Sequence, residues 1–245
     1  PNPKLEVFPI KEVSDIGKKF DVPLIMDNTA APLICNPIEH GASIVVYSTT
    51  KYIGGHGVSI GGLLIDSGNF DWEKAGDRFP MLNEPDPSYH GAIWSQAAKP
   101  LGPIAYILKA RVTLLRDLGS AMSPFNAFTF IQGLETLPLR MERHCSNAQK
   151  VADFLADHSK VSKVIYPSYM KDNYLDRANK YLKNGYGALV GFEMSSGQVS
   201  GKKFIDNLKL LYHVANIGDS RSLAIHPSST THSQLSPEDQ IAAGV

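Results

Sequence analysis

The sequence predicts an α/β fold, with a mostly parallel sheet and flanking helices, followed by a smaller C-terminal α+β domain. Short β-branched segments alternate with segments of helical periodicity in the first part of the chain, which is typical of parallel sheets. The composition is that of a folded globular protein, because 43% of the 245 residues are apolar and 20% are charged.

The first domain, residues 1–138, is expected to contain most of the alternating elements. Its apolar positions, beginning with Ile10 and Val13, recur at helical spacing. The expected elements are a helix over 9–20, a strand over 23–26, a helical stretch over 31–40, strands over 43–47 and 61–66, a long loop over 76–96 and a helix over 103–118. A loop of that length inside a compact domain is usually functional.

A domain boundary is expected at Pro138. Ser123 and Pro124 form a good N-cap and first-turn pair for a helix, which Pro138 should kink or end before helical patterning resumes to about His158. The second domain, residues 139–245, opens its last helix at Ser236 with a capping sequence. Its other expected elements are strands over 164–166, 189–194, 214–217 and 222–226 and a helix over 200–211.

Charge and cysteine usage exclude several classes of protein. Lys plus Arg and Asp plus Glu both number 24, so we expect no nucleic-acid partner. Cys35 and Cys145 form no CxxC pair, which disfavours a zinc site and favours a reducing, cytoplasmic location. No apolar run reaches membrane-spanning length, so no membrane partner is expected. The residues at both ends suggest an internal stretch of a longer protein, with both domains incomplete.

The strongest chemical pattern joins two strand ends. Asp27 directly follows one predicted strand, and Ser48-Thr49-Thr50-Lys51 directly follows the next. Ligands of parallel α/β sheets bind outside the carboxyl ends of the strands, so the two segments can face one crevice. Each residue taken alone has an ordinary explanation, since an Asp after a strand is usually a turn residue and a lone Lys is usually solvated.

Together these residue types match the needs of pyridoxal phosphate (PLP). A lysine amine can form a Schiff base, small hydroxyls donate to phosphate oxygens, and a carboxylate pairs with the pyridinium nitrogen. On an extended exit from the strand, Ser48 and Thr50 share a face and Thr49 points away. We therefore expect Ser48 and Thr50 to contact the phosphate.

The same residues carry a family resemblance. The chain resembles the Cys/Met-metabolism family of PLP-dependent enzymes, which are fold-type I PLP-dependent transferases. Within that family, the loop over 83–91 (NEPDPSYHG) is similar to O-acetylhomoserine sulfhydrylases rather than to the lyases. The matching segments are 22–29 (VPLIMDNT), 45–56 (VVYSTTKYIGGH), 133–137 with 140–144 (GLETL and RMERH), and 222–227 with 231–233 (SLAIHP and THS), while Asn2-Pro3 resembles the end of a further stretch.

The resemblance implies a role for each matching residue. Lys51 matches the catalytic Schiff-base lysine, and Asp27 matches the carboxylate beside the pyridine nitrogen. The remaining matches are Ser48, Thr50 and Thr29 at cofactor-binding positions and Asn2 and Ser222 at substrate-binding positions. No metal is implied.

The resemblance also implies an activity and an assembly. The implied reaction is γ-replacement on O-acetyl-L-homoserine by sulfide or a small thiol, which gives homocysteine or a thioether and acetate, in methionine and cysteine biosynthesis. A cystathionine γ-synthase and a cystathionine or methionine γ-lyase are the alternatives within the family. The family is homotetrameric, so a homo-oligomer is expected.

Other classes fit the sequence less well. Residues 57–61 (GVSIG) match the nucleophile elbow of serine hydrolases, with Ser59 as nucleophile, but an elbow needs a strand before it and a helix after it. A dinucleotide fingerprint is absent, because Ile60 occupies the position of its third glycine. A scaffold role without catalysis is disfavoured because Lys51 and Asp27 are both present.

Overall fold

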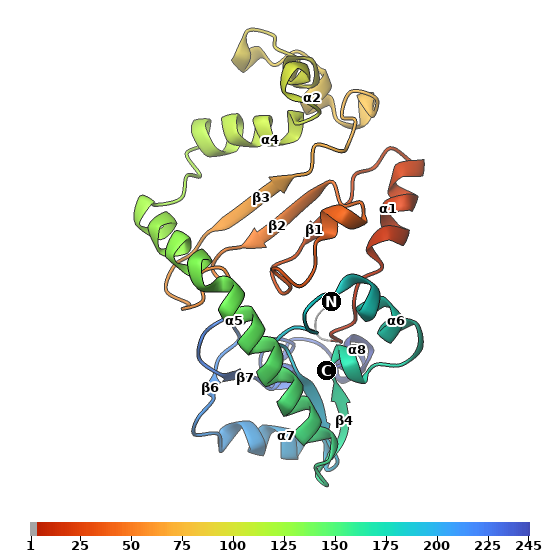
Figure 1. Cartoon of the computed structure of the whole chain (residues 1–245), viewed down its shortest axis with the longest axis vertical. Helices are drawn as coiled ribbons and strands as arrows, with labels where there is room; N and C mark the ends of the chain where they lie inside the picture. Colours follow the sequence, from red (N-terminus) through yellow and green to blue (C-terminus); the bar gives the residue numbers. More distant parts are fainter. Residues whose placement is uncertain (1–3) are drawn as a thin grey trace.

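The computed structural model describes residues 4–245. Its central sheet has the strand order β1-β2-β3, and helix α1 lies beside the sheet in Figure 1. The strands β1 and β2 pair in parallel, whereas β3 is antiparallel to β2. The bounds of these elements are Ile10–Lys19 for α1, Ile25–Asp27 for β1, Ile44–Ser48 for β2 and Gly62–Asp66 for β3.

The antiparallel β3 corrects the expectation of a mostly parallel sheet for this part of the chain. A parallel crossover needs a dozen or more residues and usually a helix. The connection from Ser48 to Gly62 is instead a turn whose Tyr52 and Ile53 are buried in the core. The chain therefore reverses direction at this edge of the sheet.

Two early elements are shorter than expected. Strand β1 begins at Ile25 rather than at Pro23, because proline has no N–H to donate to a ladder. The helical stretch expected over 31–40 is only the 3₁₀-helix Pro37–His40, which ends at Gly41 in a left-handed conformation with φ of 102°. Helix α1 occupies the positions predicted for it.

The segment expected to be a long loop folds into short helices. They enclose an apolar cluster that includes Trp72, Leu82 and Trp94, whose burial stabilises the excursion. Helix α4 follows and packs against β3, and the helix predicted to reach 118 continues from it as a π-helix. These elements are α2 (Pro80–Asn83), α3 (Trp94–Ala97), α4 (Ala105–Lys109) and the π-helix Ala110–Asp117.

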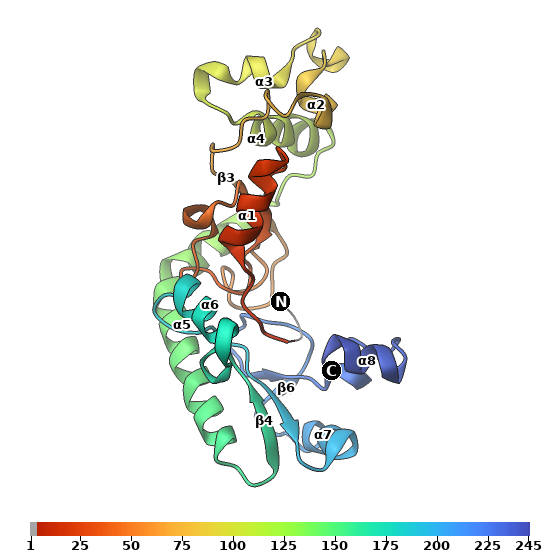
Figure 2. The ribbon, with the colours of Figure 1, turned by 90° about the vertical axis from the view of Figure 1, so that its right-hand side faces the viewer.

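Helix α5 (Pro124–Ala156) does not end at Pro138 but continues through it. Figures 1 and 2 show it running from the sheet to the part of the molecule that holds β4 and α7. Its buried positions, including Phe130, Leu137 and Met141, pack with Tyr52 and Ile53. This tertiary packing outweighs the helix-breaking preference of a single proline.

Beyond α5 the chain alternates short strands and helices. Strand β4 pairs antiparallel with β5, and β6 pairs in parallel with β7. Helix α6 was not expected, and a short β6 at Tyr212 replaces the strand predicted over 214–217. Ser236 caps α8 as predicted, accepting a hydrogen bond from the Asp239 N–H at 3.1 Å. The bounds are Val161–Ile165 for β4, Asp172–Tyr181 for α6, Gly191–Met194 for β5, Gly197–Asp206 for α7, Tyr212–His213 for β6, Leu223–Ala224 for β7 and Pro237–Ala243 for α8.

Within residues 4–245, every helix is too short or too polar to cross a membrane.

Candidate active site

The carboxyl ends of β1 and β2 meet at one edge of the sheet. Asp27, the last residue of β1, lies opposite Val46 in the parallel ladder. Its exposed carboxylate accepts a hydrogen bond from the Thr29 N–H at 2.8 Å. The Thr29 hydroxyl oxygen in turn accepts from the Ser48 N–H at 2.7 Å. The structure thus brings Asp27, Thr29 and Ser48 together, as the sequence predicts.

Lys51 lies in the turn that follows β2. The Lys51 N–H donates to the Ser48 carbonyl at 3.2 Å, and the Lys51 carbonyl accepts from the Gly55 N–H at 2.8 Å. The half-buried side chain extends to Asn216, where the amine donates to the amide oxygen at 2.5 Å. Lys51 therefore has a defined partner from a segment far along the chain.

Asn216 is a site residue that the sequence reasoning missed. Its segment packs directly on the backbone of the Lys51 turn, because a Cβ at Gly218 would lie 2.4 Å from the Tyr52 nitrogen. The Ser220 N–H also donates to the Gly55 carbonyl at 2.8 Å. A polar Asn inside the strand predicted over 214–217 was the only signal in the sequence.

The two threonines before Lys51 have different surroundings. The Thr50 hydroxyl accepts from the Gly61 N–H at 3.1 Å and donates to the Gly61 carbonyl only at 3.4 Å. The Thr49 hydroxyl is buried and has no hydrogen-bond partner within the described residues. The expected extended exit from β2 is wrong, because the Gly54 N–H bonds the Thr49 carbonyl and closes a turn. The phosphate role of Ser48 and Thr50 stays a prediction.

The segment before Ser222 carries a buried ion pair. Arg221 makes two side-chain hydrogen bonds to the Asp219 carboxylate, at 2.8 and 3.1 Å, and lowers the pKa of that carboxyl. Ser222 itself is exposed, and its carbonyl accepts from the Tyr212 N–H at 3.0 Å. Its proposed contact with substrate stays a prediction, and Asn2 lies outside the described residues.

This donor set has the chemistry that PLP requires. One strand edge presents a lysine amine, a carboxylate within an exposed loop and two hydroxyl-bearing side chains, which suit the carbonyl, ring nitrogen and phosphate of the cofactor respectively. A metal-dependent site is not supported, because no group of three His, Cys, Asp or Glu side chains in residues 4–245 is placed to hold an ion.

The serine hydrolase alternative is wrong on geometry. Residues 57–61 follow a turn rather than a strand, and strand β3 follows where an elbow needs a helix. Ser59 is also buried. Ser59 is therefore not presented as a nucleophile.

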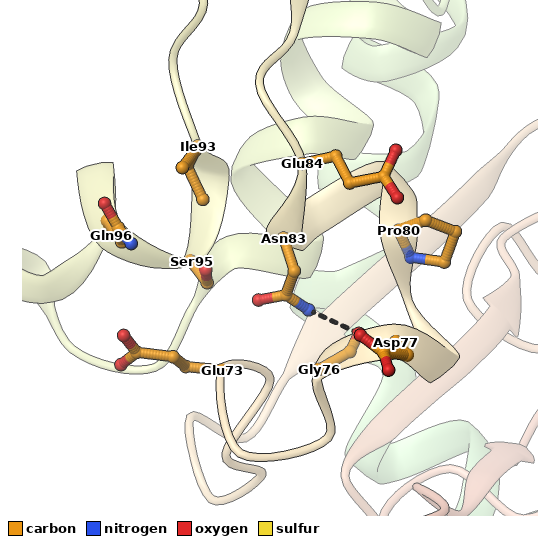
Figure 3. A pocket seen from close by; sticks show the side chains of 9 residues that line it. All are labelled: Glu73, Gly76, Asp77, Pro80, Asn83, Glu84, Ile93, Ser95 and Gln96. Carbon is orange, nitrogen blue, oxygen red and sulfur yellow. Dashed lines mark hydrogen bonds between the residues drawn. The ribbon is translucent and has the colours of Figure 1, made fainter.

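A separate cavity of about 250 Å³ lies in the excursion between β3 and α4. Figure 3 shows its lining side chains, among them Asn83, whose amide donates to the Gly76 carbonyl at 3.1 Å. The lining residues are Glu73, Gly76, Asp77, Pro80, Asn83, Glu84, Ile93, Ser95 and Gln96. None of the predicted site residues belongs to it.

Known proteins match the chain along its whole length. The family of Cys/Met metabolism PLP-dependent enzymes matches residues 1–245. The O-acetyl-L-homoserine sulfhydrylase of Leptospira meyeri is 54% identical over 251 residues, which cover 100% of this chain and 56% of that protein. The chain thus spans a little over half the length of its curated relatives.

Solved structures show the same likeness. A putative O-acetylhomoserine (thiol)-lyase from Campylobacter jejuni, which holds a pyridoxyl-lysine phosphate, superposes with a TM-score of 0.89 at 38% identity, covering 100% of this chain and 57% of that one. Cystathionine γ-synthase from Xanthomonas oryzae, in complex with aminoacrylate and cysteine, gives a TM-score of 0.77 at 29% identity, covering 100% and 54%.

The fold and the site define an α/β domain of a lysine-dependent, PLP-type enzyme. The match to the family over every residue makes the assignment specific. The chain belongs to the Cys/Met metabolism PLP-dependent enzymes.

Proposed function

We propose that the protein containing this chain catalyses γ-replacement on O-acetyl-L-homoserine with sulfide or a small thiol, giving homocysteine or a thioether and acetate. The observation that carries the proposal is the Lys51 amine, held by Asn216 at the strand edge that Asp27 also occupies. The choice of substrate is supported by relatives named as O-acetyl-L-homoserine sulfhydrylases or homocysteine synthases.

Each residue of the site has a proposed task. PLP, when bound, supplies an electron sink that stabilises negative charge on the substrate α-carbon. Lys51 anchors the cofactor and, once freed by the substrate amine, takes the α-proton. Asp27 holds the ring nitrogen in its charged form, because an opposite charge nearby favours ionisation. Ser48 and Thr50 donate to the phosphate, Thr29 orders the loop between them, and Asn2 and Ser222 bind substrate.

Asn216 keeps the Lys51 amine in place while it acts. Its amide oxygen accepts a hydrogen bond from the amine, so the lone pair and the protons of the amine have fixed directions. A base must lie within hydrogen-bond reach of the proton that it removes. The contact therefore supports Lys51 as the group that moves the α-proton.

A homo-oligomer in the cytoplasm completes the proposal. Helix α5 exposes an apolar row of Phe125, Phe128 and Ile131, with exposed fractions of 75%, 58% and 59%. Contiguous exposed apolar side chains are typical of surfaces that another chain or segment covers. Two buried thiols, Cys35 and Cys145, suit a reducing compartment.

A steady-state assay of the complete protein tests the activity. We expect turnover of O-acetylhomoserine with sulfide to exceed that of cystathionine and of methionine. The Lys51→Ala variant should fold, yet lose both turnover and the covalent cofactor label that borohydride traps. Preference for cystathionine or methionine would identify the protein as a γ-synthase or lyase, and wild-type rates in Lys51→Ala would refute the site.

A further inference from the structure

Helix α5 crosses the turn that carries Lys51 at very close range. At Gly133, an added Cβ would lie 2.2 Å from the Ile53 carbonyl oxygen, a distance that no side chain tolerates. Glycine at this position lets the backbone of α5 rest on the backbone of the turn. The next contact between the two elements comes from Arg140, further along the helix.

Arg140 binds the main chain of this turn with its guanidinium group. One terminal nitrogen donates to the Tyr52 carbonyl at 2.6 Å, and the other donates to the Ile53 carbonyl at 3.1 Å and to the Gly133 carbonyl at 2.7 Å. The remaining nitrogen, Nε, donates to the Thr136 hydroxyl at 3.1 Å. The planar group thus joins the helix to the two residues that follow Lys51.

The bonds complete the hydrogen bonding of the turn. The carbonyls of Ser48, Thr49 and Lys51 accept from N–H groups within the turn itself. The carbonyls of Tyr52 and Ile53 accept from Arg140. A buried carbonyl without a donor is costly, so loss of the guanidinium should release this end of the turn.

We propose that Arg140 is a positioning residue for Lys51. It ties the turn to α5 and so holds the Lys51 amine against Asn216 at the strand edge. Three carbonyls in fixed directions match the planar fork of arginine, and the single ammonium of lysine cannot replace it fully. The proposal deepens the proposed function and rests on it for the identity of the reaction.

The test compares Arg140→Gln and Arg140→Lys with Arg143→Gln, a change of an exposed arginine on the same helix. The readouts on the complete, cofactor-loaded protein are kcat, KM, and the visible circular dichroism per bound cofactor, which reports how the lysine-linked ring is held. For Arg140→Gln we expect kcat to fall about tenfold or more with KM within about threefold, because a displacement on the order of 1 Å can cost about 10²-fold in rate.

The dichroism should weaken in Arg140→Gln, recover in part in Arg140→Lys and stay unchanged in Arg143→Gln. Wild-type kcat and dichroism in Arg140→Gln would overturn the proposal, as would a loss explained wholly by unfolded protein in a thermal melt. If Arg140→Gln does not fold, Arg140→Lys decides by the same criteria. If the wild-type protein binds cofactor but does not turn over O-acetylhomoserine, the proposed function fails, and the dichroism still decides the role of Arg140.

Discussion

Asp27 and Lys51 are brought to one edge by the parallel pairing of two short strands. Only their separate positions after β-branched segments are visible in the sequence. The carboxylate stays exposed, with one oxygen accepting from the Thr29 N–H. The other oxygen is free of intramolecular bonds within the described residues, so a ring nitrogen can donate to it.

Replacing Asp27 with asparagine tests this role. Asparagine keeps the size of the side chain but removes the charge that stabilises a protonated ring nitrogen. We expect turnover to fall by about tenfold or more, since an opposite charge nearby shifts a pKa by about 1–3 units. Bound cofactor, measured by absorbance after gel filtration, should fall much less. An equal loss of cofactor and turnover would assign Asp27 to binding rather than to catalysis.

The three hydroxyl residues before Lys51 should separate by variant. Ser48→Ala and Thr50→Val each lose a donor to the phosphate, and a hydrogen bond to a charged acceptor contributes about 1.5–3 kcal/mol. Cofactor affinity should therefore fall about tenfold or more, by about one decade per 1.4 kcal/mol. Thr49→Val should retain the cofactor, because it removes a buried hydroxyl that lacks a partner.

Titration of the three variants with cofactor under one set of conditions measures the difference. Thr49→Val also serves as the control for stability, since removing an unsatisfied buried hydroxyl is neutral or stabilising. A Thr49→Val protein that loses cofactor as readily as Thr50→Val would remove the basis for the phosphate assignment.

At the scale of elements, the excursion between β3 and α4 is stapled by Asp86. Its carboxylate accepts from the Trp94 indole N–H at 2.8 Å and from the Ser88 N–H at 3.0 Å, and it pairs with Lys109. The side chain is 9% exposed. The bonds from Lys109 and Trp94 lower the pKa of Asp86 to about 2.

This lowered pKa predicts an acid-sensitive contribution to stability. The unfolded chain binds the proton at a pKa of about 3.9, so the stabilising effect of ionised Asp86 is complete above that pH and is lost as the pH falls through about 2. Asp86→Asn should melt at a lower temperature than wild type at neutral pH. The gap should narrow below about pH 4. The control is Asp157→Asn, at an exposed carboxylate after α5, and a gap that is constant with pH would contradict the assignment.

At the scale of the whole molecule, α5 joins the sheet to the strands and helices that follow it (Figure 1). Its continuity through Pro138 allows one rigid element to carry both Gly133 and Arg140. The apolar cluster of Phe130, Leu137 and Met141 with Tyr52 holds the helix to the turn of Lys51. The site and the long helix therefore form one packed unit.

Gly133→Ala tests how closely this unit is packed. At an open helical position, alanine in place of glycine would stabilise the protein by about 1 kcal/mol. Here the new Cβ meets the Ile53 carbonyl, so we expect a loss of about 1–3 kcal/mol, typical of overpacking. Urea unfolding measures the change, with Gln132→Ala as the exposed control on the same helix. A stabilised Gly133→Ala protein would show that the helix can move away from the turn.

The sequence by itself determined the elements that depend on local patterns. Helical periodicity placed α1, a β-branched run placed β2, and a serine before proline placed the start of α8. The segment before Lys51 and the position of Asp27 also indicated the family. These features could be predicted because periodicity, capping and turn preferences act over a few neighbouring residues.

Only the tertiary structure decided how distant segments meet. It reversed β3, carried α5 through Pro138, and placed Asn216 on the Lys51 amine and Arg140 on the carbonyls after it. These contacts join residues far apart in the chain, and their stability depends on packing and buried hydrogen bonds rather than on local preference. For that reason the identity of the lysine was evident from the sequence, and the groups that hold it in place were not.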